Sequence, residues 1–141
     1  MDSKYDLAGK VIGCAMRVHS ELGPGFLEKV YQKAMAIELA EAGLEFEVEK
    51  RIRVRYREQV IGDYVADIVV CDEASEIIVE LKAVIALTTA HEVQLVNYLT
   101  ATGIAVGLLL NFGGESLQFK KKYGKFRQNF QKAMEGKFRQ N

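Results

Sequence analysis

The stretch that decides the fold runs from residue 65 to residue 84 and reads VADIVVCDEASEIIVELKAV. It contains two apolar runs rich in β-branched residues, separated by Asp72–Ser75, a tetrad of the kind that forms turns. This pattern predicts strands over residues 60–71 and 76–84. With a loop over 72–75, the two strands are expected to pair antiparallel.

Three charged side chains interrupt these apolar runs. Asp67 lies within the first run, and Glu80 and Lys82 lie within the second. Burying a charge is costly unless the charge is paired or binds a metal ion. The expected register places Asp67 opposite Glu80, and Lys82 shares a face with Glu80. Two carboxylates this close repel each other unless a cation lies between them or one is protonated, and a hard divalent ion such as Mg²⁺ satisfies that requirement.

The flanking sequence predicts an α/β domain with the element order ααβββαββα. Alternating residues predict a strand over 44–57, and the apolar run 104–111 predicts a strand buried on both faces. The unit 76–111 predicts a right-handed crossover whose two strands are parallel. The other predicted elements are helices over residues 4–22, 26–43, 89–102 and 126–138 and a short strand near Leu117 and Phe119.

Two of these helices carry further patterns. Thr89–Glu92 is typical of a capping box at a helix start. His91 shares a helical face with Gln94 and Tyr98, so it can approach a phosphate or cap the helix. The second helix is expected to bury its apolar side, formed by Phe26, Leu27, Val30, Ala34 and Ile37.

Composition excludes several classes of protein. Apolar residues make up 49% and charged residues 27%, which is typical of globular proteins, and no apolar run approaches the ~20 residues of a membrane helix. Cys14 and Cys71 form no CxxC pair, so neither a disulfide scaffold nor a zinc site is indicated. The polar, acidic start of the chain lacks the order of a signal peptide, so we expect a cytoplasmic protein.

Charge is unevenly distributed along the chain. The net charge is zero, but residues 115–141 carry eight basic and two acidic residues, a local charge of +6. This end is either a solvated basic tail or a surface that binds a polyanion. Such a surface contacts phosphates without reading the base sequence. The candidate nucleic-acid contacts are Arg51, Arg53, Arg55 and Arg57, expected on one face of a strand, and Lys120, Lys121, Lys122, Lys125 and Arg127.

An apolar stripe recurs every four residues near the end of the chain, at Phe126, Phe130, Met134 and Phe138. Such a stripe on one helical face is expected to pack either on this chain or on a second copy, because soluble monomers avoid exposed apolar patches. A homodimer is therefore one expectation.

An acid on one strand, then E-x-K on the next and a helix after it, resembles the PD-(D/E)XK nuclease superfamily, with Ala66 at the position of the proline. A narrower resemblance, to the GxxExxY proteins, rests on Gly25-x-x-Glu28-x-x-Tyr31 and on further matches over residues 7–122. These further matches are Glu80–Val84, Gln94–Leu99 and Gly107–Gly113.

This resemblance implies a restriction-endonuclease-like core, a mixed β-sheet flanked by helices, and we assign it to residues 1–122. Residues 123–141 lie outside the resemblance and are expected to form a basic amphipathic helix or tail. It implies that Asp67 and Glu80 bind Mg²⁺ or Mn²⁺ and that Lys82 acts on the attacking water and the developing phosphorane charge. Glu28 and Gln94 match the supporting acid and the helix position that often accompany such a site.

The sequence leaves three hypotheses for function. The first is a Mg²⁺-dependent nuclease that hydrolyses phosphodiester bonds of DNA or RNA. The second is a phosphodiesterase or nucleotide hydrolase acting on a smaller phosphate ester. The third is a catalytically inactive nuclease-fold module that binds nucleic acid or serves as a scaffold. The three charges within apolar strands favour an enzyme, because a scaffold has no physical reason to keep them.

Overall fold

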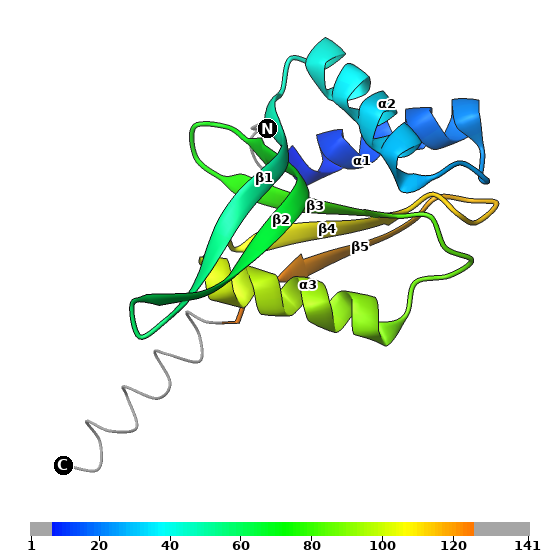
Figure 1. Cartoon of the computed structure of the whole chain (residues 1–141). Helices are drawn as coiled ribbons and strands as arrows, with labels where there is room; N and C mark the ends of the chain where they lie inside the picture. Colours follow the sequence, from blue (N-terminus) through cyan, green and yellow to red (C-terminus); the bar gives the residue numbers. More distant parts are fainter. Residues whose placement is uncertain (1–6, 126–141) are drawn as a thin grey trace, which may run out of the picture.

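The computed structural model describes residues 7–125 and contains a five-stranded mixed sheet between two layers of helices (Figure 1). The strand order is β1-β2-β3-β4-β5; β3 and β4 are parallel, and the other neighbours are antiparallel. The elements are α1 (Leu7–Leu22), α2 (Glu28–Glu41), β1 (Glu45–Tyr56), β2 (Gln59–Cys71), β3 (Glu76–Lys82), α3 (Thr89–Thr102), β4 (Val106–Asn111) and β5 (Gln118–Tyr123). The predicted α/β fold is confirmed, and the terminal helix predicted over 126–138 lies outside the described residues.

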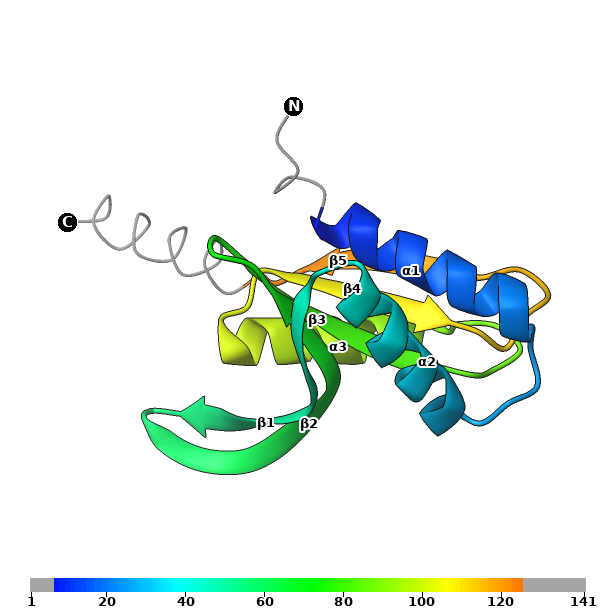
Figure 2. The same ribbon diagram turned by 90° about the horizontal axis from the view of Figure 1, so that it is seen from above.

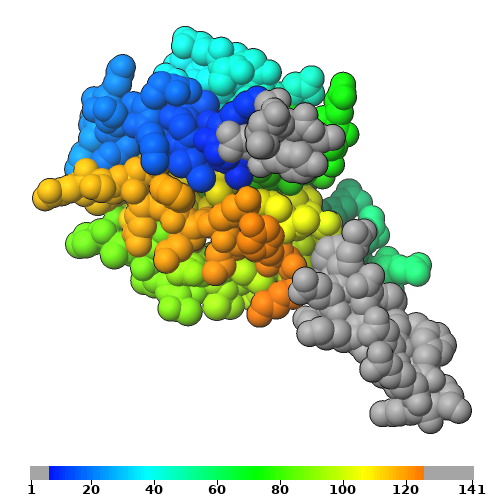
Figure 3. Space-filling model, turned by 180° about the vertical axis from the view of Figure 1, so that it is seen from behind, coloured from blue at the N-terminus to red at the C-terminus, as the bar shows by residue number. Residues whose placement is uncertain are grey.

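The sheet separates two apolar cores. Helices α1 and α2 cover one face, where the larger core includes Ile68, Val79 and Leu110, and α3 covers the other, where Leu95 and Leu109 pack (Figures 1 and 2). From behind, β5 is visible between α1 and α3 (Figure 3). Within residues 7–125, no helix is long and apolar enough to cross a membrane.

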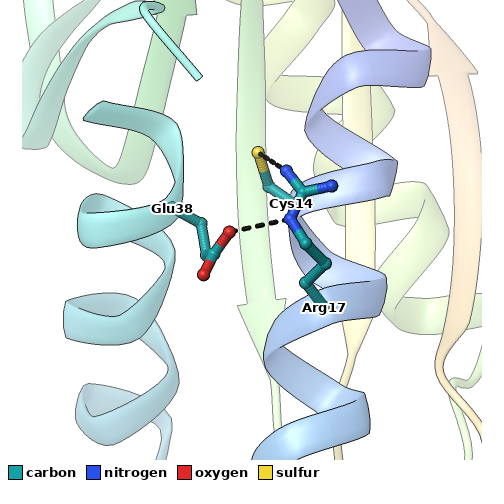
Figure 4. A network of polar contacts seen from close by, with 3 residues as sticks. All are labelled: Cys14, Arg17 and Glu38. Carbon is teal, nitrogen blue, oxygen red and sulfur yellow. Dashed lines mark hydrogen bonds and ion pairs between the residues drawn. The ribbon is translucent and has the colours of Figure 1, made fainter. Parts of the chain in front are cut away.

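Polar contacts join α1 to α2 and to the β4–β5 loop. Arg17 donates from Nε to Glu38 Oε1 at 2.8 Å and lies 3.4 Å from Cys14 Sγ (Figure 4). Burial raises the pKa of the Cys14 thiol, which is fully buried. His19 Nε2 lies 2.8 Å from the Gly114 carbonyl. The polar side chains of α1 named here therefore have structural partners, which explains them without a functional role.

The buried face of α2 differs from the predicted one. The helix buries Tyr31, Gln32, Met35 and Leu39, whereas the predicted apolar side is largely exposed. Tyr31 explains the difference, because its ring stacks on Phe112 at 4.6 Å and its hydroxyl donates to the carbonyl of Gly23 at 2.6 Å. A buried aromatic ring with a satisfied hydroxyl outweighs the smaller side chains on the other face. The tyrosine of the GxxExxY motif is thus part of the core.

The hairpin of β1 and β2 bends from the α2 side of the sheet to the α3 side (Figure 1). On β2, Ile68 packs with the α1/α2 core, but Ala66 and Val69, three residues apart, both pack with the α3 core. Regular alternation would put residues three apart on opposite faces, so alternation breaks at Asp67. On β1, Glu49 lies at the matching position, between the pairs Val48–Ile68 and Lys50–Ala66, and has a φ of 55°.

Candidate active site

The pairing of β2 with β3 ends where the charged residues begin. The two strands pair from Cys71–Glu76 to Ile68–Val79, in the predicted register. Beyond this point β2 stays with β1, whereas β3 continues beside β4. Asp67 and Glu80 are the next residues on the two strands, so they lie at the opening.

Asp67 replaces a missing strand contact with side-chain contacts. Its carboxylate oxygen Oδ2 accepts a hydrogen bond from the Leu81 N–H at 2.8 Å. Its backbone carbonyl accepts one from Gln32 Nε2 at 3.0 Å, and Gln32 is 6% exposed. The opening is therefore held at Asp67 by β3 on one side and by α2 on the other.

Glu80 is half-buried and accepts a hydrogen bond from the Tyr64 hydroxyl. Burial, and then the charge of Asp67, raise the pKa of Glu80 from 4.5 to about 7, against the opposing effects of Tyr64, the Asp67 backbone and Lys82. Burial also raises the pKa of Tyr64, whose ring stacks on Tyr98 of α3 at 3.6 Å. Tyr64 thus stays protonated and donates to Glu80.

A cavity of about 210 Å³ lies on the α3 side of the opening. It brings the predicted catalytic residues Lys82 and Gln94 together with Glu80, so β3 and α3 form its walls. Its lining residues are Tyr64, Glu80, Lys82, His91, Gln94, Leu95, Tyr98 and Leu109.

A smaller cavity of about 90 Å³ lies on the α2 side, and Asp67 and Glu28 line it. Glu28 is exposed at the first position of α2. Lys29 and Glu49 also line this cavity, and they form an ion pair that joins α2 to β1. Glu28 therefore shares a cavity with Asp67 and not with Glu80 and Lys82.

Among the described residues, none of the predicted nucleic-acid contacts lines either cavity at the opening. On the hairpin, Arg51, Arg53 and Arg55 are exposed, but Arg57 lies in the turn with a φ of 50°, so the prediction of a single face for all four arginines is wrong. The ladder is also irregular between Val54 and Arg55.

The lysines of β5 do not form one cationic face. Because side chains alternate along a strand, Lys121 faces away from Lys120 and Lys122. The Lys122 ammonium pairs with Glu92 at 2.9 Å, and Lys121 Nζ lies 5.5 Å from the centre of the Tyr123 ring. A cavity of about 460 Å³ between α3 and β5 includes Lys121 and Lys122 but none of the predicted catalytic or metal-binding residues. The volume of a cavity therefore does not by itself identify the candidate active site.

Sequence reasoning missed two supports of the site, Gln32 and Tyr64. Regular alternation puts Tyr64 on the face opposite Asp67, and only the break at Asp67 turns it toward Glu80. Tyr98, which shares a helical face with His91 and Gln94, is half-buried, packs against the core beneath α3 and lines the larger cavity. A polar residue on the buried face of α2 is the one signal that could have identified Gln32.

The carboxylates at the opening have the ligand chemistry of a magnesium ion that keeps most of its water, with Asp67 lining the cavity on the α2 side and Glu80 the cavity on the α3 side. Within residues 7–125, no group of three or more His, Cys, Asp or Glu side chains is close enough to hold a metal by itself. Mg²⁺ is commonly bound by one or two carboxylates together with water and substrate phosphate. Asp67 and Glu80 supply two carboxylates whose mutual repulsion a cation would relieve.

Comparison with known proteins identifies the family of this chain. No curated protein matches the chain. A solved structure described as "Crystal structure of SSO0001" aligns with 82% of this chain and 66% of its own, just under two thirds, at 16% identity and a TM-score of 0.49. The family model of the PD-(D/E)XK nuclease superfamily matches residues 5–123, and the narrower resemblance to GxxExxY proteins stays a prediction. The chain belongs to the PD-(D/E)XK nuclease superfamily.

Proposed function

We propose that this protein is a Mg²⁺- or Mn²⁺-dependent nuclease that hydrolyses phosphodiester bonds of DNA or RNA. One observation carries the proposal: in a chain of this superfamily, the β2–β3 ladder ends just before Asp67 and Glu80, the two residues that the sequence resemblance predicts as metal ligands. The site residues are assigned from this placement, with Asp67 and Glu80 as metal ligands.

The divalent cation supplies Lewis acidity toward the phosphate when it is bound. In the reaction, the oxygen of a water molecule bonds to phosphorus and one ester P–O bond breaks. The water loses one proton to a base, and the leaving oxygen takes up one proton. The products are a phosphate monoester and a hydroxyl group.

The chain's own residues position the reactants and stabilise charge. The Lys82 ammonium stabilises the negative charge that develops on the phosphate oxygens and orients the attacking water. Gln94 offers an amide to the same cavity, and Glu28 supports the side that contains Asp67. The exposed Arg51, Arg53 and Arg55, with Lys120, Lys121 and Lys122, contact the phosphate backbone.

The larger organisation is part of the proposal. The nuclease-like domain covers residues 1–122, and the basic tail covers 123–141. The apolar stripe expected to pack on this chain or, in a homodimer, on a second copy lies outside the described residues. A cytoplasmic location fits a nuclease that acts on cellular nucleic acid.

Digestion of purified full-length protein with plasmid DNA, single- and double-stranded oligonucleotides and RNA tests the proposal. We expect cleavage in Mg²⁺ or Mn²⁺, none in chelator, and a loss of about 10²–10³-fold in rate for Lys82→Ala. Lys33→Ala, at an exposed lysine of α2, is the matched control and should cleave like wild type.

Two other outcomes would replace the proposal. Hydrolysis of bis(p-nitrophenyl) phosphate without cleavage of any polymer would favour a phosphodiesterase for smaller esters. Binding of nucleic acid with no hydrolysis under any metal condition would favour an inactive binding module.

A further inference from the structure

His91 has a defined place at the start of α3. The predicted cap at Thr89 is wrong by one residue, because Thr88 is the N-cap and His91 is the third helical residue. The His91 N–H donates to Thr88 Oγ1 at 3.3 Å, and His91 Nδ1 accepts from the Thr88 N–H at 3.1 Å. Glu92, the acid expected to complete the cap, is instead paired with Lys122.

This cap determines which ring nitrogen of His91 carries the proton. A neutral imidazole has one donor nitrogen and one acceptor nitrogen. Because Nδ1 accepts from the Thr88 backbone, the proton lies on Nε2. Within residues 7–125, no side chain or backbone group accepts a hydrogen bond from this Nε2–H.

His91 also lines the 210 Å³ cavity, together with Glu80, Lys82 and Gln94. The strand side of this cavity presents a carboxylate and an ammonium, and the α3 side presents the Gln94 amide beside the imidazole. His91 is half-buried, so its free donor remains open to a ligand in the cavity.

We propose that His91 donates from Nε2–H to a phosphate oxygen of the nucleic-acid substrate. The inference rests on the proposed function and adds a substrate-binding residue to it. The cap keeps Nε2 as the donor, and Lys82 lies in the same cavity and attracts the phosphate.

Two substitutions separate phosphate binding from helix capping. His91→Asn keeps an acceptor oxygen close to the position of Nδ1 but removes the Nε2–H. His91→Lys supplies N–H donors that can reach a phosphate but has no acceptor for the Thr88 N–H, so it removes the cap. We expect His91→Asn to melt like wild type with kcat/KM reduced about 10- to 100-fold, mainly through KM. We expect His91→Lys to melt lower than wild type, because it loses the cap and places a cation at a helix N-terminus, but to cleave better than His91→Asn.

The proposal predicts that the two variants rank in opposite order, with His91→Asn the more stable and the less active of the two. If His91→Asn cleaves at the wild-type rate, the proposal is overturned and the histidine is only a cap. The same holds if activity follows the melting temperature in both variants.

A binding measurement separates failure of this inference from failure of the proposed function. The anisotropy of fluorescein-labelled DNA duplex, DNA single strand and RNA strand is measured in chelator with Lys82→Ala and with Lys82→Ala/His91→Asn. We expect about 10-fold weaker binding of the best probe by the double variant. Equal affinities overturn the role of His91 even if wild type cleaves. Weaker binding by the double variant supports it even if wild type is inactive on every substrate. If neither variant binds any probe, the inference is overturned.

Discussion

The pair of strands β2 and β3 has two halves that differ in chemistry. In the closed half, Ile68–Cys71 and Glu76–Val79 pair through backbone hydrogen bonds, and most of their side chains are apolar and buried. In the open half, Asp67, Glu80 and Lys82 lie where the two strands separate. The comparison explains how apolar strands tolerate charge: the charges lie beside a gap where the backbone no longer pairs.

In the open half, side chains make the hydrogen bonds that pairing between β2 and β3 would otherwise supply. The Asp67 carboxylate binds the Leu81 N–H, and Gln32 binds the Asp67 carbonyl. The backbone is thus satisfied without closing the strands, which leaves Glu80 and Lys82 facing a cavity. The following predictions test whether the closed half supplies stability and the open half supplies function.

The largest expected effect on stability comes from the closed half. Ile78 is fully buried in the core beneath α3. Ile78→Ala removes methylene and methyl groups and leaves a cavity, so we expect the free energy of unfolding to fall by about 2–5 kcal/mol. Urea unfolding measures this loss. A loss below about 1 kcal/mol would show that the closed half is not the rigid part of the pair.

The next effect is a pH dependence that the open half produces. The pKa of Glu80 is raised in the folded protein from 4.5 to about 7. Between pH 4.5 and about pH 7, the folded state therefore binds more protons than the unfolded chain. The contribution of Glu80 to stability is therefore present at low pH and is lost as the pH rises toward 7. In chelator at pH 8, the free energy of unfolding of Glu80→Gln should exceed that of wild type by on the order of 2 kcal/mol.

Thermal melts of both proteins at pH 5 and pH 8 check this dependence. The stability advantage of Glu80→Gln should shrink at pH 5, where the wild-type carboxyl is protonated in the folded state. An advantage that is equal at both pH values would contradict the assigned cause.

A smaller effect is expected at Gln32, which holds the opening from α2. Gln32→Leu leaves the Asp67 carbonyl without its donor, so we expect a loss of about 1–3 kcal/mol in the free energy of unfolding. Gln94→Leu, at an exposed glutamine of α3, is the matched control and should change stability by no more than about 0.5 kcal/mol. Equal effects of the two substitutions would mean that Gln32 does not support the opening.

The smallest effect concerns the hairpin that carries β2 away from β3. The double variant Arg51→Ala/Arg53→Ala should reduce the slope of log affinity against log salt by about 0.9 for each duplex phosphate that the protein no longer neutralises. Lys10→Ala/Lys33→Ala removes the same charge from the exposed surface of α1 and α2 and should leave the slope near wild type. Titration of labelled duplex at several salt concentrations distinguishes the two. An equal change in both variants would assign the effect to net charge alone.

The sequence predicted the element order and the β2–β3 register because alternation and turn residues are local signals. It predicted Asp67, Glu80 and Lys82 because charge within an apolar run is conspicuous. It could not predict Tyr64, because alternation breaks at Asp67, opposite a positive φ at Glu49, and glutamate rarely adopts such an angle. The buried face of α2 was also mispredicted, because Tyr31 packs on Phe112, which is distant in sequence.

The most direct test of the metal site compares melting curves of wild type and Asp67→Asn in chelator and in Mg²⁺. The asparagine oxygen can still accept from the Leu81 N–H, so the substitution removes charge at nearly constant shape. With a dissociation constant of about 1 mM, about 10 mM Mg²⁺ adds about 1.4 kcal/mol to wild-type stability, a rise of roughly 2–8 °C. We predict this rise for wild type, its near loss in Asp67→Asn, and a higher melting temperature for Asp67→Asn in chelator. A wild type without a Mg²⁺ shift, together with an Asp67→Asn variant that is clearly less stable in chelator, would make Asp67 a structural acceptor and contradict the metal site.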